Sequence, residues 1–434
     1  MKNQYGIKYE RKLHILIIHA SPWNDDTSGN NILTNWFSGI DMNFANIYRG
    51  SGKPQNECCQ KYFQITDMMM LKSLYSNKKA GHSFSLFQEA RIEKNISENT
   101  MRYFKKNSNG FTSFLRSLVW LFGRYDEQSL SSFIQDFSPD VVFSCRKACL
   151  ATLRLERIVH QYTEAPFISF TGDDEYSLMQ WRFDPFFWIE RFMTRRSIQN
   201  NVKFYKRYLT LSEEQAENYH KLFGCETGIL RKCATFDLYD PEKKCGEPIR
   251  MVYAGKLYCN RWHTIGKLSE AISIVNSEYA RQVFTLDIYA VDDVKKKFLS
   301  EIGKNEACHL HAVIPSSQLP DIYRYSDIIL HVESFDRRNK WDTRLSFSTK
   351  IIDCLGSGCA VMAISWERQT GFRYLKREDA AICIPSVSEI IGTLRRIAED
   401  LSIVDKYAQK AQICLQRNHN KTDVQEKIIN AFTL

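Results

Sequence analysis

Residues 345–361 read LSFSTKIIDCLGSGCAV, and this stretch decides the fold. The segment Ser348–Ser357 predicts a helix, because hydroxyl side chains that favour helix starts precede an apolar pattern. Gly356-Ser-Gly358 then ends the helix. The apolar run Cys359–Ile364 follows at once and predicts a buried strand. A helix that turns directly into a buried strand is typical of α/β proteins.

The same alternation extends outward through the second half of the chain. Short apolar runs recur with helical patterns between them, and they predict a parallel sheet flanked by helices, which is a Rossmann-like domain. The predicted strands are Arg250–Ala254, Val283–Ala290, His309–Ile314, Asp327–Glu333 and Ala380–Ile384.

The first half predicts a second α/β domain with an irregular insertion at about residues 50–109. Its predicted strands are Lys12–Ala20, Asp140–Ser144, Phe167–Thr171 and Tyr208–Ser212. The proline-containing stretch Tyr239–Pro248 is the predicted linker, so the domains are expected at 1–240 and 241–434. Two such domains are expected to face a central cleft, with ligands at the carboxyl ends of the strands.

The start of the helix in the deciding stretch is a candidate anion site. Ser346, Ser348 and Thr349 precede Lys350, and a helix N-terminus offers unpaired N–H groups and a positive dipole end. Asp353 lies about one turn further on, where a carboxylate can meet a sugar hydroxyl beside a phosphate. The plainer alternative is a capped helix without a ligand.

Two cations follow the first strand of the second domain. In the segment YAGKLYCNR (253–261), the strand ends at Gly255, Lys256 comes next, and Arg261 precedes a helix. Cations at the mouth of a strand can clamp a pyrophosphate, and arginine can do so with two parallel hydrogen bonds. A solvated basic loop is the alternative.

These residues resemble the donor-binding domain of GT-B glycosyltransferases, especially family 4 and related enzymes of bacterial surface-polysaccharide synthesis. Gly255, Lys256, Leu257 and Arg261 are similar to that family's glycine–cation–leucine run. Tyr323–Asp327 and Asp353–Val361 are similar to two later motifs. The resemblance implies two Rossmann-like domains, no metal or other cofactor, and transfer of a sugar from a nucleotide-diphosphate donor to a glycan or lipid-linked acceptor with retention of configuration.

The resemblance also implies roles for single residues. Lys256, Arg261 and the N–H groups around Ser348 and Thr349 would hold the donor diphosphate, and Asp353 would bind the ribose. The family's sugar-contacting glutamate falls on Leu345, so Glu333, at the end of its strand, is a candidate replacement. Relatives whose helix starts with serine, phenylalanine and a later lysine also lack that glutamate, and residues 346–350 resemble them.

Clustered carboxylates follow the strand Phe167–Thr171, at Asp173, Asp174 and Glu175. They are consistent with a metal site of the single-domain GT-A type, with helix capping, or with an acid near the reaction centre. Because the second half resembles GT-B proteins, Asp173 or Asp174 is the candidate that orients the acceptor hydroxyl.

Aromatic residues alternate with arginines in Trp181–Arg207, and Phe111–Phe122 is also aromatic and apolar. This pattern is typical of a helix on an anionic membrane surface, and equally of an amphipathic helix packed on a sheet.

Length and composition limit which ligands and which cellular environment the protein can have. The chain has 434 residues and a net charge of +9, which suits a phosphate-bearing ligand or an anionic surface but falls short of a nucleic-acid binder. Its 13 cysteines form no Cys-x-x-Cys pair, so reduced cytoplasmic thiols are expected and a zinc site is not. No apolar run approaches the roughly 20 residues of a membrane span.

The expected function is therefore that of a cytoplasmic glycosyltransferase in polysaccharide biosynthesis, with the inner face of the plasma membrane as a further expected location. A GT-B-fold nucleotide-sugar epimerase and a non-catalytic nucleotide-binding partner subunit are the alternatives. The last helix is expected to pack back on the first domain.

Overall fold

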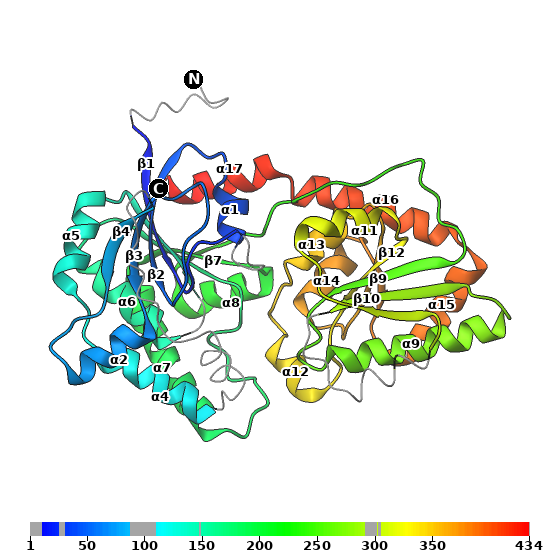
Figure 1. Cartoon of the computed structure of the whole chain (residues 1–434), viewed down its shortest axis with the longest axis horizontal. Helices are drawn as coiled ribbons and strands as arrows, with labels where there is room; N and C mark the ends of the chain where they lie inside the picture. Colours follow the sequence, from blue (N-terminus) through cyan, green and yellow to red (C-terminus); the bar gives the residue numbers. More distant parts are fainter. Residues whose placement is uncertain are drawn as a thin grey trace. The chain divides into compact units, whose positions relative to one another are not determined.

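The computed structural model describes residues 11–25, 31–86, 110–146, 149–290, 302 and 305–433, and it divides into two units (Figure 1). Unit 1 contains the described residues up to Leu178, then Arg182–Leu230, and those from Gln425 onward. Unit 2 contains Met179–Trp181 and Arg231–Val424. The division falls ten residues before the predicted boundary at 240, and residues 231–240 belong to unit 2.

Unit 2 is built on a six-stranded sheet in the order β11-β10-β9-β12-β13-β14, in which every pair is parallel. The strands are β9 Ile249–Gly255, β10 Phe284–Ala290, β11 Cys308–His311, β12 Ile328–Val332, β13 Ala360–Ile364 and β14 Ile382–Ile384. β12 and β13 are buried along their whole length, which explains why their sequences are apolar except for His331.

Helices lie between these strands along the chain and follow the last of them. Those between strands are α9 Arg261–Glu278, α11 Leu319–Arg324, α12 Arg337–Asp342, α13 Lys350–Leu355 and α14 Thr370–Arg377, and α15 Ile390–Glu399 and α16 Ser402–Asn418 follow β14. α9 shows how they form, since Leu268, Ile272 and Val275 recur at helical spacing and are buried in the core with the sheet.

Unit 1 has an eight-stranded sheet in the order β4-β3-β2-β1-β5-β6-β7-β8, parallel throughout except for the antiparallel pair β3–β4. The strands are β1 Leu13–His19, β2 Met42–Arg49, β3 Lys61–Ile65, β4 His82–Ser85, β5 Val141–Arg146, β6 Phe167–Thr171, β7 Tyr205–Thr210 and β8 Glu226–Ile229. The helices are α1 Ile32–Phe37, α2 Asp67–Tyr75, α4 Gly110–Phe122, α5 Glu127–Phe137, α6 Leu150–His160, α7 Pro185–Asn201 and α8 Glu213–Phe223.

The last helix, α17 (Lys421–Phe432), ends the chain in unit 1. The Gln425 amide donates to the carbonyl groups of Trp36 (3.1 Å) and Ser38 (2.9 Å), and the Phe432 ring lies against those of Phe37 and Phe143. Hydrogen bonds and ring packing thus hold the end of the chain on the first domain's core.

Both sheets contain the same doubly wound core. β3-β2-β1-β5-β6-β7 in unit 1 and β11-β10-β9-β12-β13-β14 in unit 2 each start in the middle, run to one edge, and return to run to the other. In such sheets ligands bind beyond the carboxyl ends of the two central strands, where the order reverses. The α/β prediction with two Rossmann-like domains is confirmed.

The prediction for residues 50–109 is corrected in part. β3, α2 and β4 lie in this stretch and extend the sheet, and residues 87–109 lie outside the described part. The strand before it, β2, was not predicted because Asn46 interrupts its apolar pattern. This asparagine is fully buried, and its amide donates to the Ile17 carbonyl (3.2 Å), so hydrogen bonding offsets its burial.

Candidate functional site

The reversal point of the unit 2 sheet lies between β9 and β12 and carries charged residues. β9 ends at Gly255 and is followed by Lys256; β12 ends at Val332 and is followed by Glu333. Arg261 is the first residue of α9. The parallel pairing of β9 with β12 brings both strand ends to one edge of the sheet.

Arg261 and Glu333, 72 residues apart, form a two-point ion pair. The guanidinium donates from Nε (3.0 Å) and from a terminal nitrogen (2.7 Å) to the two carboxylate oxygens. The side chains are 16% and 3% exposed. Burial alone would lower the pKa of Arg261, but the charge of Glu333 and the two hydrogen bonds raise it above its ordinary value. This pair holds the arginine rigidly at the strand ends.

Lys350 brings a further cation to Gly255. Its ammonium donates to the Ala254 carbonyl (3.1 Å), and a Cβ added at Gly255 would lie 1.8 Å from Nζ. Only glycine leaves room for this contact. The Lys350 side chain as a whole is exposed, but burial of the ammonium, with repulsion by Arg261 and Lys256, lowers its pKa to about 8.

Lys256, Arg261 and Lys350 therefore form a cation cluster at the reversal point. Lys256 is exposed beside them, and its backbone carbonyl accepts a hydrogen bond from the Tyr253 hydroxyl (2.8 Å). Glu333 balances one of the three charges. Burial is the main cause of the lowered pKa of Lys350, and repulsion by Arg261 and Lys256 lowers it further, so a bound anion would favour its charged form.

The helix in the deciding stretch is shorter than predicted. α13 begins at Lys350, with Thr349 as its N-cap, and the Thr349 side chain makes no capping hydrogen bond. Ser346 and Ser348 precede the helix and are half-buried, while Leu345 is 3% exposed. The Ile351 and Ile352 N–H groups donate to the Ser348 (3.0 Å) and Thr349 (3.2 Å) carbonyls, and the Ser346 N–H donates to the Thr343 carbonyl (3.1 Å). This leaves the N–H groups of residues 348–350 as the candidates for an anion.

Asp353 has an internal partner, Lys232, which sequence reasoning missed. The ammonium lies 2.8 Å from the carboxylate, and the two side chains are 8% and 21% exposed. The segment that carries Lys232 continues over the end of α13: the Leu238 N–H donates to the Gly356 carbonyl (2.9 Å), and a Cβ at Gly356 would lie 2.3 Å from the Phe236 carbonyl oxygen. Gly356 thus permits close backbone packing as well as ending the helix.

His331 is a second residue that sequence reasoning missed. It lies on β12, two residues before Glu333, and is 5% exposed. Its Nε2 atom has no hydrogen-bond partner in the described part of the chain, and burial lowers its pKa to about 4. A single histidine within an apolar strand gives no sequence signal that separates a site residue from a core residue.

The carboxylates after β6 in unit 1 have different environments. Asp174 is buried and accepts a hydrogen bond from the Arg191 guanidinium of α7 (3.2 Å) and from the Ser177 N–H (2.9 Å). Asp173 is exposed, and its carbonyl accepts from the Gln215 amide (2.8 Å). Asp174 therefore joins the β6 loop to α7, and of these two carboxylates only that of Asp173 faces solvent.

Comparison with known proteins bears on the fold. Neither a protein-family model nor a curated protein sequence matches the chain. Among solved structures, HepE from Anabaena in complex with UDP and glucose is 11% identical over 97% of this chain and 99% of its own, with a TM-score of 0.58. Sucrose-phosphate synthase from Thermosynechococcus elongatus is 11% identical over 97% and 98%, with a TM-score of 0.60. WaaG, a glycosyltransferase involved in lipopolysaccharide biosynthesis, is 11% identical over 97% and 99%, with a TM-score of 0.57.

The fold is GT-B. The prediction of this fold from the residues 255–261 and 345–361 is confirmed, since the likeness covers nearly the whole chain. At these identities the likeness establishes the arrangement of strands and helices, and the roles of single residues are argued from their own geometry.

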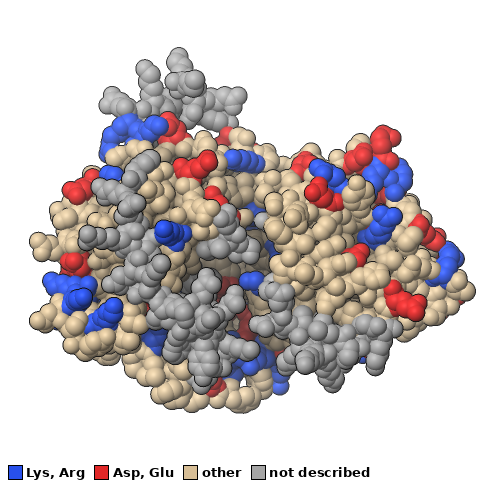
Figure 2. All heavy atoms as spheres, viewed as in Figure 1, with Lys and Arg blue, Asp and Glu red and all other residues tan. Residues whose placement is uncertain are grey.

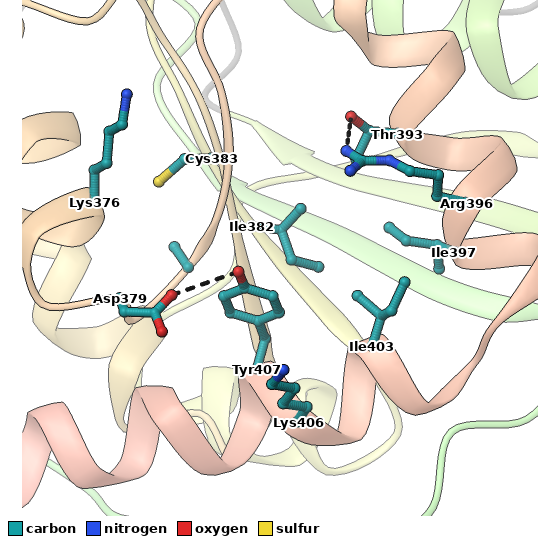
Figure 3. A pocket seen from close by; sticks show the side chains of 11 residues that line it. Lys376, Asp379, Ile382, Cys383, Thr393, Arg396, Ile397, Ile403, Lys406 and Tyr407 are labelled. Carbon is teal, nitrogen blue, oxygen red and sulfur yellow. Dashed lines mark hydrogen bonds between the residues drawn. The ribbon is translucent and has the colours of Figure 1, made fainter.

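A cavity of about 340 Å³ lies elsewhere in unit 2 of this GT-B protein, beside β14. Figure 3 shows Ile382, Ile397 and Ile403 with Lys406 and Tyr407 around it. Asp379 and Ala381, which line the cavity, precede β14, so the cavity lies at the amino end of that strand. The cation cluster, in contrast, lies at the carboxyl ends of β9 and β12. The cavity therefore has no part in the candidate site.

The described residues contain neither a metal-type cluster of side chains nor a membrane-spanning helix. No three His, Cys, Asp or Glu side chains there come together as a metal site requires. No helix in that part of the chain is long and apolar enough to cross a membrane.

Proposed function

We propose that this protein is a glycosyltransferase that moves a sugar from a nucleotide-diphosphate donor to a hydroxyl of a glycan or lipid-linked saccharide, in polysaccharide biosynthesis. The observation that carries the proposal is the cation cluster of Lys256, Arg261 and Lys350 at the reversal point of the unit 2 sheet. Structures with the same fold support it, since HepE was solved with UDP and glucose, and another neighbour with UDP-2-fluoro glucose.

The cluster supplies what breaking the bond between sugar and diphosphate requires. Negative charge grows on the departing diphosphate, and cations already in position stabilise it more in the transition state than in the bound donor. Lys256 and Lys350 meet the phosphate oxygens. Arg261 meets them from a rigid position, because Glu333 holds its guanidinium from the other side.

Glu333 is accordingly a positioning residue in this mechanism, since both its oxygens already accept from Arg261. The N–H groups of Ser348 and Thr349 add donors for the diphosphate, whereas the Ser346 N–H already donates to the Thr343 carbonyl. Asp353 accepts from the ribose hydroxyls, and its pairing with Lys232 fixes the direction of the carboxylate.

Asp173 acts on the acceptor. As the exposed carboxylate beyond β6, it orients the acceptor hydroxyl and assists loss of its proton. Asp174 holds the loop through Arg191. Transfer proceeds without a metal ion, because the cations of the chain meet the diphosphate charge. Retention of configuration is proposed from the resemblance to family 4.

The test is a thermal-shift and isothermal-titration panel of nucleoside diphosphates, nucleoside monophosphates and nucleosides. A ligand at 100 times its dissociation constant stabilises by about 2.7 kcal/mol. We expect tight binding only for diphosphates and nucleotide sugars. Equal affinity for a nucleoside and its diphosphate would contradict the role of the cation cluster.

A second assay separates the proposal from its alternatives. With donor and a saccharide acceptor, a transferase releases nucleoside diphosphate together with a glycosylated product, and the reaction continues in EDTA. An epimerase would convert the donor without acceptor, and a partner subunit would bind nucleotide without releasing product.

A further inference from the structure

Three helices of unit 1, α2, α4 and α7, are neighbours (Figure 1). Each of them carries exposed large apolar side chains. Side-chain contacts show that α4 packs against both α2 and α7. The Trp120 indole of α4 donates to the Asp67 carboxylate of α2 (2.5 Å), and the rings of Phe111 and Phe186 join α4 to α7 at 5.0 Å. We call the outward side of these helices the apolar face.

α4 carries large apolar side chains on its exposed side as well as on its packed side, where Trp120 is buried. Phe111, Leu115 and Phe122 lie on one side of it at helical spacing and are 46%, 44% and 66% exposed. Ser113 and Ser117, in contrast, point toward α7 and donate to Glu190. A surface helix normally buries its apolar side, so exposed aromatic residues in a row indicate a binding surface.

The two flanking helices continue the apolar face. On α7, Ile189 and Phe192 are 46% and 56% exposed and share a side of the helix with the exposed Arg196. On α2, Leu71, Leu74 and Tyr75 are exposed, Tyr75 by 72%. Large apolar side chains thus lie on the solvent side of all three helices.

Two arginines predicted to serve as surface cations lie inward instead. Arg191 binds Asp174 and the Ser177 carbonyl, and Arg195 donates to the Tyr176 carbonyl and stacks on that ring at 3.9 Å. Part of the aromatic and arginine pattern therefore packs α7 on unit 1, as the alternative sequence interpretation held.

Other cations surround the apolar face. Lys78 and Lys79 follow Tyr75 and are exposed, as is Arg196. The two carboxylates within the ranges of the three helices are both engaged, Asp67 by Arg116 and Trp120, and Glu190 by the two serines. Figure 2 shows Lys and Arg side chains among uncharged residues at the lower edge of unit 1, where Figure 1 draws these helices.

We propose that the apolar face docks on an anionic membrane surface. Phenylalanine, leucine and tyrosine side chains enter the boundary between headgroups and acyl chains, and lysine and arginine side chains bind anionic headgroups. Each cation near such a surface raises partitioning on the order of fivefold, and burial of each exposed phenylalanine on the order of tenfold.

The location of the face suggests what docking serves. α2 follows the carboxyl end of β3, and the loop that leads to α7 follows the carboxyl end of β6. Ligands of parallel sheets bind at this edge. A membrane-bound, lipid-linked acceptor would therefore arrive beside Asp173. This last step rests on the proposed function, whereas the docking itself does not.

The test is flotation of the full-length protein with vesicles of phosphatidylcholine, with and without 30 mol% phosphatidylglycerol. We expect binding to the anionic vesicles that weakens with added salt. Phe122→Ser/Phe192→Ser should lower partitioning on the order of 100-fold. The matched control Leu222→Ser/Ile413→Ser removes residues that are 58% and 54% exposed outside these helices, and it should bind as wild type does.

A charge-reversal pair tests the cations. Lys78→Glu/Lys79→Glu should lower binding at least 25-fold, on the order of fivefold for each cation removed. Lys203→Glu/Lys206→Glu makes the same charge change at two exposed lysines, one just after α7 and one in β7, and it should leave binding near that of wild type.

The outcomes separate this proposal from the proposed function. Each variant must keep its circular dichroism and its affinity for nucleoside diphosphate, which shows that unit 2 is intact. No binding of wild type to anionic vesicles, or equal losses in test and control variants, would overturn the membrane proposal while the transferase assay stands. The membrane proposal would also be overturned if the wild-type protein were a dimer that does not bind vesicles and that becomes monomeric in Phe122→Ser/Phe192→Ser. That result would identify the apolar face as a protein interface.

Discussion

The carboxyl edges of the two sheets differ in how they treat charge. In unit 2, one carboxylate pairs with one of three cations, and burial, with repulsion by Arg261 and Lys256, lowers the pKa of Lys350 to about 8. In unit 1, the loop beyond β6 buries one of its carboxylates against Arg191 and leaves Asp173 exposed. The same doubly wound core thus carries a cluster of cations at one edge and an exposed carboxylate at the other. The strand order therefore places the polar residues, while the loops after the strands determine their chemistry.

The largest expected effect tests the unit 1 edge. Asp173→Asn should lower turnover with acceptor about 10²–10⁴-fold, because it removes the proposed assistance to proton loss. The measurement is steady-state transfer at saturating donor, with nucleoside diphosphate affinity measured alongside. Unchanged turnover would remove Asp173 from the mechanism.

Replacement of Asp174 should lower the stability of the protein, whereas replacement of Asp173 lowers turnover. Asp174→Ala leaves the Arg191 charge buried without its carboxylate, and loss of one partner of a buried pair typically costs about 3–5 kcal/mol. Urea denaturation should show this loss in the free energy of unfolding. The matched variant Asp173→Ala should stay within about 0.5 kcal/mol of wild type, as exposed positions usually do.

The unit 2 edge is tested by Arg261→Ala. It should weaken binding of nucleoside diphosphate by about 1.5–3 kcal/mol through loss of a charge-assisted contact, with little change for the free nucleoside. Because Glu333 is then buried alone, Arg261→Ala should also lose stability. Arg261→Ala/Glu333→Gln should recover that stability without recovering the affinity, and recovery of both would show that the pair is only structural.

The smallest effect concerns pH. An anion binds the protonated form of Lys350, so affinity for nucleoside diphosphate is highest below pH 8 and falls as pH rises through the pKa of about 8. Calorimetric titrations from pH 6.5 to 9.5 should show a decrease of about tenfold, the usual worth of one charge-assisted contact. Lys350→Met should flatten the profile. A profile equally steep in that variant would assign the titration to another group.

Much of unit 2 and little of the first hundred residues could be predicted. Apolar residues dominate most strands of the second half, and β13 is wholly apolar, because a parallel sheet covered by helices buries both of its faces. β2 was missed because its buried Asn46 depends on a carbonyl in β1, and β3 and the edge strand β4 are short, with five and four residues. The contact of Lys350 with Gly255 could not be predicted from the sequence either, since the two residues are neighbours only in the folded protein.

The sequence by itself determined the GT-B fold and the presence of cations at a strand end, because helix and strand periodicity, glycine turns and residue order are local properties. Only the tertiary structure decided the partners. Arg261 meets Glu333 because β9 and β12 are neighbours in the sheet, Asp353 meets Lys232 across 121 residues, and Asp174 is buried by an arginine from α7. Partner choice depends on which distant segments pack together, and a buried charge takes whichever opposite charge that packing brings within reach.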